Sequence, residues 1–145
     1  MEKNRPGVGF GVMVLRDGRI LLGRRHTDPQ KADSELHGEG TWTMPGGKLH
    51  FKESFEEGAK RELLEETSLK GEKFQIISLT NDIVSDAHFV TIGLLCQEFT
   101  GEPKIMEPEE ITEWRRFPFG KLPKKVFLPS LKIIKNYGNK VFYGA

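Results

Sequence analysis

Residues 47–66 decide the fold, and they read GKLHFKESFEEGAKRELLEE. Within them, Ser54 and Glu57 have the spacing of a capping box, in which each side chain bonds a backbone N–H group of the first helical turn. A narrow apolar stripe follows at helical spacing, formed by Phe55, Ala59, Leu63 and Leu64. The stretch therefore predicts a helix that begins at Ser54 and ends near Thr67 or Ser68.

Three carboxylates share one face of this predicted helix. Each residue turns an α-helix by about 100°, so Glu65 and Glu66 both lie within about 60° of Glu62. Like charges at this spacing weaken a helix by about 0.2–0.5 kcal/mol per pair, so helix stability alone does not favour them. A divalent cation would offset the repulsion, and carboxylate oxygens suit hard ions such as Mg²⁺ or Mn²⁺. The alternative is a solvated acidic helix face, which is the ordinary explanation of a Glu-rich helix.

The rest of the chain alternates between strand and helix signals. Asp17-Gly18 joins two apolar runs and predicts a β-hairpin over residues 8–23. Further strands are expected over residues 74–84, 88–99 and 114–119, and a second helix over Leu128 to Tyr137. Residues 26–41 and 101–113 are expected to be loops, and Pro45-Gly46-Gly47 is a turn signal. The order of elements predicts a mixed α/β layered domain.

Length and composition narrow the class of protein. The 145 residues predict one domain over 1–145. The net charge of +1 argues against a nucleic acid polymer as partner. The one cysteine, Cys96, excludes an internal disulfide and fits a cytoplasmic location. Since we find no apolar run long enough to span a bilayer and no signal-peptide pattern, we expect no membrane association.

The stretch from Gly47 to Leu69 resembles the Nudix box of the MutT-like pyrophosphohydrolases. The matching positions are Gly47, Glu53, Arg61, Glu62, Leu63, Glu65, Glu66 and Leu69. One position departs, because Ser68 stands where the family has Gly at the helix end, a place that often needs a left-handed backbone. We expect this to cost about 1 kcal/mol of backbone strain and to leave the chemistry unchanged. The similarity extends to about residue 123 and favours a metal site over a solvated acidic face.

The resemblance implies roles for the matched residues. Glu62, Glu65 and Glu66 would bind the divalent ions together with the backbone carbonyl of Gly46. Glu62 or its neighbours would activate the attacking water. Glu53 would assist as a nearby carboxylate, and Arg61 would hold a helix carboxylate in position by a charge-assisted hydrogen bond. A further acidic residue would come from the loop after the last long strand, with Glu107, Glu109, Glu110 and Glu113 all open as candidates.

The resemblance also suggests residues that contact the substrate. Arg24 and Arg25 are candidates for binding phosphate, but adjacent strand residues face opposite ways, so at most one is expected to reach the site. Phe89 lies in a strand that the family uses near the base, and Glu110 is the acid we assign to substrate binding. Trp42 could stack on a base, although we expect it in the core. The pocket is expected from residues 26–41, 88–92 and 101–113.

The expected fold is therefore α/β (α+β), a Nudix α/β/α sandwich with a mixed β-sheet. The implied activity is Mg²⁺- or Mn²⁺-dependent cleavage of a (deoxy)nucleoside triphosphate, an oxidised one included, to the monophosphate and pyrophosphate. The alternative within the enzyme class is an ADP-ribose or other nucleoside diphosphate-sugar pyrophosphatase. The alternative of another class is a non-catalytic nucleotide sensor. The expected partner is a small nucleotide, and a homodimer is left open.

Overall fold

The computed structural model describes residues 4–31 and 38–144, so residues 32–37 of the predicted 26–41 loop lie outside the described part. The described elements run in the order β1 (Gly7–Arg16), β2 (Arg19–Arg25), β3 (Trp42–Thr43), β4 (Gly46–Lys48), α1 (Phe55–Thr67), β5 (Lys70–Val84), β6 (Ala87–Thr100), β7 (Ile111–Pro118) and α2 (Leu128–Gly138). No helix within these residues is long and apolar enough to cross a bilayer.

Strand β1 is the centre of the sheet because it pairs along both edges. On one edge it runs parallel to β6, and β5 continues the sheet antiparallel to β6. On the other edge it pairs antiparallel with β4 over Gly9–Gly11 and then with β2 at Leu15 and Arg16. Strands β3 and β7 both pair with β2. The sheet is mixed, as predicted.

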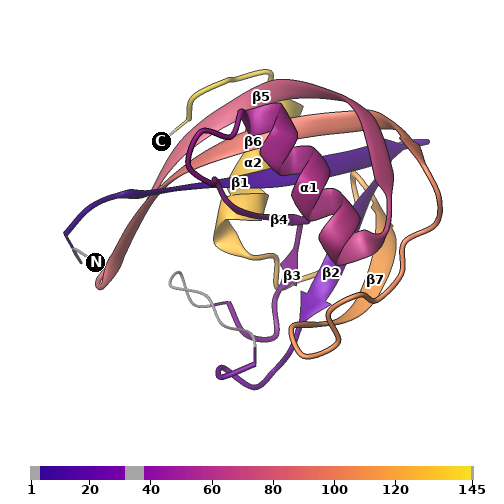
Figure 1. Ribbon diagram of the computed structural model, residues 1–145, viewed down its shortest axis with the longest axis horizontal. Coiled ribbons are helices and arrows are strands. Elements are labelled where there is room, and N and C mark those ends of the chain that lie inside the picture. Colours follow the sequence, from indigo (N-terminus) through magenta and orange to yellow (C-terminus); the bar gives the residue numbers. More distant parts are fainter. Residues whose placement is uncertain (1–3, 32–37, 145) are drawn as a thin grey trace.

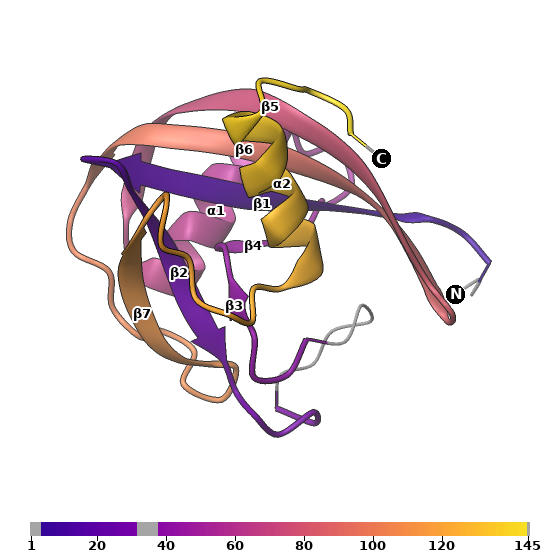
Figure 2. The same ribbon diagram turned by 180° about the vertical axis from the view of Figure 1, so that it is seen from behind.

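The alternation of side chains along β1 creates two cores, one on each face of the sheet. Phe10, Val12 and Val14 are buried with Ala59 and Leu63 of α1. Met13 points to the other face and is buried with residues of α2. Helix α1 lies in front of the sheet and α2 behind it in Figure 1, and their places are exchanged in Figure 2. This arrangement is the expected α/β/α sandwich.

Helix α1 has the predicted boundaries and caps. Its capping box is complete, since Ser54 Oγ accepts from the Glu57 N–H group and the Glu57 carboxylate accepts from the Ser54 N–H group. The helix ends at Ser68, which has the left-handed backbone (φ 71°) that the position was expected to require. Cys96 is buried as expected.

Two strand predictions were incomplete. Strand β7 begins at Ile111, inside the predicted 101–113 loop, because it pairs with nearly the whole length of β2. The short strands β3 and β4 flank Pro45, where only a turn was predicted. Pairing with distant partners sets the start of β7 and forms β3 and β4, and a local pattern does not encode such partners.

Candidate functional site

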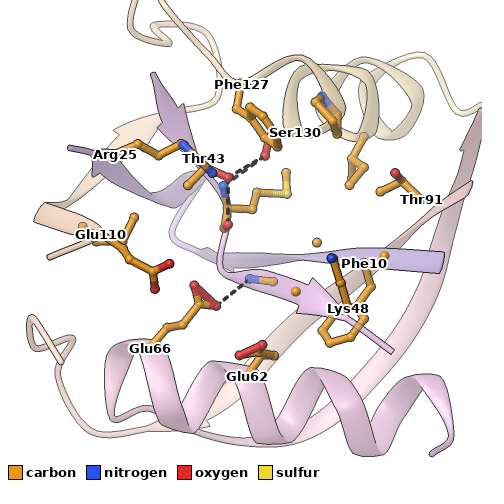
Figure 3. Close-up of a pocket in the computed structure, with 18 of the residues that line it drawn as sticks. Phe10, Arg25, Thr43, Lys48, Glu62, Glu66, Thr91, Glu110, Phe127 and Ser130 are labelled. Atoms are coloured by element: carbon orange, nitrogen blue, oxygen red, sulfur yellow. Dashed lines mark hydrogen bonds between the residues drawn. The ribbon is translucent and has the colours of Figure 1, made fainter. Parts of the chain in front are cut away.

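A cavity of about 470 Å³ reaches from α1 to the beginning of α2, although these helices cover opposite faces of the sheet. It passes beside β1 at β4, a strand of three residues in which Gly46 and Gly47 carry no side chain. Figure 3 shows the Glu62 and Glu66 carboxylates on α1 at one end, and Phe127 and Ser130 at the other. The cavity therefore joins an acidic end to a more apolar one.

The helix carboxylates at the acidic end differ in their surroundings. Burial raises the pKa of Glu62 to about 7, with repulsion from Glu65 and Glu107 adding to it and Arg61 opposing it. Burial also raises the pKa of Glu66 well above its usual range, and the Glu62 charge contributes. Glu65 does not line the cavity, and its side chain is 52% exposed. Of the three predicted ligands on α1, two thus face the cavity directly.

The glycines of β4 let these carboxylates approach the backbone. A Cβ atom on Gly47 would overlap the Glu62 carboxylate, and one on Gly46 would overlap the Phe10 carbonyl oxygen. The Gly46 N–H group donates to Glu66 Oε2 at 2.8 Å. Gly46 therefore lies against the Glu66 carboxylate through its N–H group, and the role of its carbonyl as a ligand stays a prediction.

Arg61 differs in part from its expected role. Its Nε and Nη2 donate to the two oxygens of Glu53 at 2.7 and 3.0 Å, so the bidentate bond goes to the turn before α1 rather than to a helix carboxylate. Its Nη1 lies 3.4 Å from Glu62 Oε2 and 3.6 Å from Glu65 Oε2. This guanidinium lowers the pKa of Glu53 to about 2. Glu53 does not line the cavity.

The loop before β7 contributes two further carboxylates. Glu107 and Glu110 line the cavity, whereas Glu109 pairs with Lys31 at 3.7 Å and Glu113 pairs with Arg115. Burial raises the pKa of Glu107, and the neighbouring Glu110 adds to the shift. Of the four acidic candidates, Glu107 and Glu110 are therefore the two that line the cavity.

The candidate substrate residues divide between the cavity and its surroundings. Arg25 and Phe89 line the cavity. Arg24 does not, and it lies in a shallower pocket beside Trp42, so at most one of the two arginines reaches the site, as predicted. Trp42 is buried and packs edge-to-face on Phe117 at 4.9 Å, which confirms the core interpretation.

Sequence reasoning missed the wall built from α2 and β3. Phe127, Pro129, Ser130 and Ile133 line the cavity together with Thr43 and Met44. Ser130 Oγ accepts from the Met44 N–H group at 3.1 Å and lies 3.3 Å from Thr43 Oγ1. The expected contribution from residues 26–41 is not seen among the described residues of that segment. In the sequence, Pro129 marked the start of the second helix, but nothing there indicated which residues this helix would pack against.

The donor chemistry at the acidic end fits a hard divalent cation. Within residues 4–31 and 38–144, no three His, Cys, Asp or Glu side chains are already arranged to hold a metal ion. Burial nevertheless raises the pKa values of Glu62, Glu66 and Glu107, and repulsion from neighbouring carboxylates adds to each shift. A cation among them would relieve that repulsion, and oxygen ligands are those that Mg²⁺ and Mn²⁺ prefer.

Comparison with known proteins identifies a protein family that matches most of the chain. A family model described as NUDIX domain matches residues 5–137. The chain is 34% identical over 96 residues to an oxidized purine nucleoside triphosphate hydrolase of Mus musculus, an alignment covering 66% of this chain and 47% of the mouse protein. It is 29% identical over 134 residues to an ADP-ribose pyrophosphatase of Methanocaldococcus jannaschii, covering 91% of this chain and 73% of that protein. The chain thus spans about half the length of the mouse relative.

A solved structure has the same architecture. The crystal structure of a MutT NUDIX hydrolase from Burkholderia pseudomallei superposes with a TM-score of 0.81 at 29% identity. The superposition covers 91% of this chain and 98% of the other. The chain therefore has the fold of this hydrolase.

Proposed function

The chain belongs to the NUDIX family, and on that premise we propose that it is a divalent-metal-dependent pyrophosphohydrolase of a nucleotide. The proposed substrate class is a (deoxy)nucleoside triphosphate, one with an oxidised base included, which is cleaved to the monophosphate and pyrophosphate. The observation that supports this proposal is the joining of an acidic end and a more apolar end in one cavity. Such a cavity suits a ligand with a polyphosphate and a flat apolar base.

The proposed chemistry assigns a role to each end. At the acidic end, Glu62, Glu65, Glu66 and the Gly46 carbonyl would hold the cation, with Glu107 as the further acid beside them. Glu62 would also accept a proton from the attacking water. Arg61 and Glu53 form the bidentate pair that fixes the start of α1. Arg25 binds phosphate, Phe89 and Glu110 contact the rest of the nucleotide, and Arg24 lies outside the reaction. When bound, a divalent cation polarises the phosphoryl oxygens and offsets their charge.

A second candidate is hydrolysis of ADP-ribose or another nucleoside diphosphate-sugar. The observation that favours it is the archaeal relative, whose alignment covers more of this chain than that of the mouse relative. Both substrates contain the same phosphoric anhydride, so the carboxylates alone do not separate them. A non-catalytic nucleotide sensor is the candidate of another class. We disfavour it because all of the box carboxylates are present.

A substrate panel tests the proposal. Purified protein is incubated with each dNTP, with 8-oxo-dGTP and with ADP-ribose, in Mg²⁺ and separately in Mn²⁺, and the products are separated by chromatography. We expect monophosphate and pyrophosphate from at least one triphosphate. Faster cleavage of ADP-ribose to AMP and ribose 5-phosphate would select the second candidate. Tight nucleotide binding without turnover in either metal would select the sensor.

The remaining parts of the proposal concern the ion and the setting. Nudix hydrolases generally use divalent metal ions. We propose Mg²⁺ for this chain, with Mn²⁺ able to replace it. We further propose that it acts in the cytoplasm as a single domain on a free nucleotide, and gel filtration would decide whether it forms a homodimer.

A further inference from the structure

A buried polar cluster lies outside the proposed active site, between β5, β6 and α2. Its centre is Asp82, which is only 3% exposed. The hydroxyl groups of Thr80 and Thr91 donate to Asp82 Oδ2 at 3.0 and 2.6 Å. Lys132 of α2 forms an ion pair with Asp82 Oδ1, its Nζ lying 2.9 Å away. A carboxylate at this depth needs such partners, because an unpaired buried charge is costly.

Asp82 does not line the cavity, but its partners belong to two of the cavity walls. Thr91 lines the cavity from β6. Lys132 lies between Ser130 and Ile133, which line it from α2. Asp82 therefore links the β6 wall to the α2 wall through one hydrogen bond and one ion pair.

The packing beneath α2 explains why such a link matters. Ile133 lies directly over Gly11 and Gly93, where an added Cβ atom would come within 3.0 and 2.8 Å of its side chain. Glycines offer no side chains to interlock with the helix, so apolar contact there sets its distance from the sheet but resists sliding weakly. Hydrogen bonds are directional, and an ion pair holds two charged groups close together. Lys132–Asp82 and the bond from Asn136 Nδ2 to Ser78 Oγ at 3.0 Å therefore fix where α2 lies along the sheet.

We propose that Asp82 is a positioning residue that fixes Thr91 against α2 and thereby sets selectivity for the nucleobase. The proposal rests on the proposed function, in which the α1 carboxylates meet the phosphates. The opposite end of the cavity, which Thr91 and α2 line, is then left for the base. Misplacing that end changes how different bases fit, while the hydrolytic step at the α1 end continues.

The first experiment measures kcat and KM of Asp82→Asn for the four dNTPs. We expect KM for the preferred nucleotide to rise on the order of 10-fold, as for the loss of one or two positioning contacts. We expect kcat to change by less than about twofold, and the spread of kcat/KM among the four bases to narrow. Lys135→Met is the matched control, because it removes a charge from an exposed position of the same helix. A kcat loss with unchanged KM and unchanged selectivity would overturn the proposal.

A second variant separates positioning from general stability. Asp82→Asn leaves Lys132 without its carboxylate partner, and the melting temperature is expected to fall. Adding Lys132→Met removes that charge and should recover the melting temperature. If Asp82 acts by holding Thr91, selectivity stays flattened in the double variant. Recovery of selectivity together with stability would show that Asp82 only supports the fold.

A double-mutant cycle tests the link to Thr91 directly. Thr91→Val removes the hydroxyl group with little change of shape, and it should reproduce the KM increase of Asp82→Asn. The two changes together should add little, because both act on the same Thr91–Asp82 contact. Full additivity of the two KM effects would contradict the proposal. Failure of the proposed function is recognised separately, because the unmodified protein would then cleave no triphosphate.

Discussion

Three glutamates within a stretch of fourteen residues acquire different proton affinities from their surroundings. Arg61 holds the pKa of Glu53 at about 2, whereas burial raises that of Glu62 to about 7 and that of Glu66 well above its usual range. An arginine fork stabilises a charged carboxylate, and burial among like charges destabilises it. The residue type alone therefore does not determine which glutamate gives up its proton last.

Glu62 is the residue with the clearest expected effect on rate. Glu62→Gln keeps the shape of the side chain and removes its ability to accept a proton. If Glu62 is the general base, kcat should fall on the order of 10² to 10⁴-fold, measured as pyrophosphate release from the preferred triphosphate. Glu56→Gln, at an exposed position on the same helix, is the matched control. Near-normal turnover in Glu62→Gln would remove Glu62 from this role.

The raised pKa of Glu62 predicts how stability depends on pH in the metal-free protein. Its pKa is about 7 when folded and lower, in the ordinary range, when unfolded. The folded state therefore binds the proton more tightly, so this stabilising contribution is present below the unfolded pKa and is lost as pH rises through about 7. The melting temperature without metal should be higher near pH 6 than near pH 8, and Glu62→Gln should reduce that difference.

Added Mg²⁺ should reverse the trend, because a cation binds the deprotonated carboxylates. The increase in melting temperature on adding Mg²⁺ should be larger near pH 8 than near pH 6. The comparison is between melting curves recorded at each pH with EDTA and melting curves recorded with added Mg²⁺. An equal increase at both pH values would place the ion away from Glu62.

At the scale of elements, helix α1 is specified by its own sequence at both ends. The capping box fixes its beginning, and Ser68 ends it in a left-handed conformation (φ 71°) that a glycine adopts without strain. Ala59 and Leu63 are buried on the side of the helix that faces the sheet. Glu62 and Glu66 flank these buried residues, so the packing that holds the helix on the sheet also directs both carboxylates into the cavity.

The end of α1 gives a stability prediction. Ser68→Gly should raise the free energy of unfolding by up to about 1 kcal/mol by relieving the left-handed strain. Urea denaturation in the presence and absence of Mg²⁺ measures the change, and kcat should stay the same because Ser68 does not line the cavity. A destabilised variant would mean that the greater freedom of glycine in the unfolded chain outweighs the strain.

The part of the fold that sequence could predict is the part that local contacts determine. The first hairpin, the main strands and both helices have local signals in turns, caps and apolar periodicity. The α2 wall has none, since Ser130 meets Thr43 across 87 positions of sequence. Asp82 and Thr91 likewise read as ordinary residues of two strands. Family resemblance predicted the acidic face of the site, and the rest depends on tertiary packing.

At the scale of the whole molecule, a balanced charge conceals strong local fields. The chain has 22 basic and 21 acidic residues. Glu62, Glu66, Glu107 and Glu110 nevertheless line one cavity, with Arg25 and Lys48 among the other lining residues. A net charge near zero therefore says little about whether a protein binds cations, because the site depends on where the charges gather.

The short strand β4 leaves room beside β1, because Gly46 and Gly47 have no side chains. The cavity passes through this space from α1 to α2. A bound nucleotide would therefore fill this space and contact residues of both helices, which would restrict their relative motion. Hydrogen–deuterium exchange should then slow at β4 and at the first turn of α2 when nucleotide binds to Glu62→Gln, and the far end of the β5–β6 hairpin should exchange as before. In each catalytic cycle, β4 and the first turn of α2 would become more rigid when substrate binds and more mobile when product leaves.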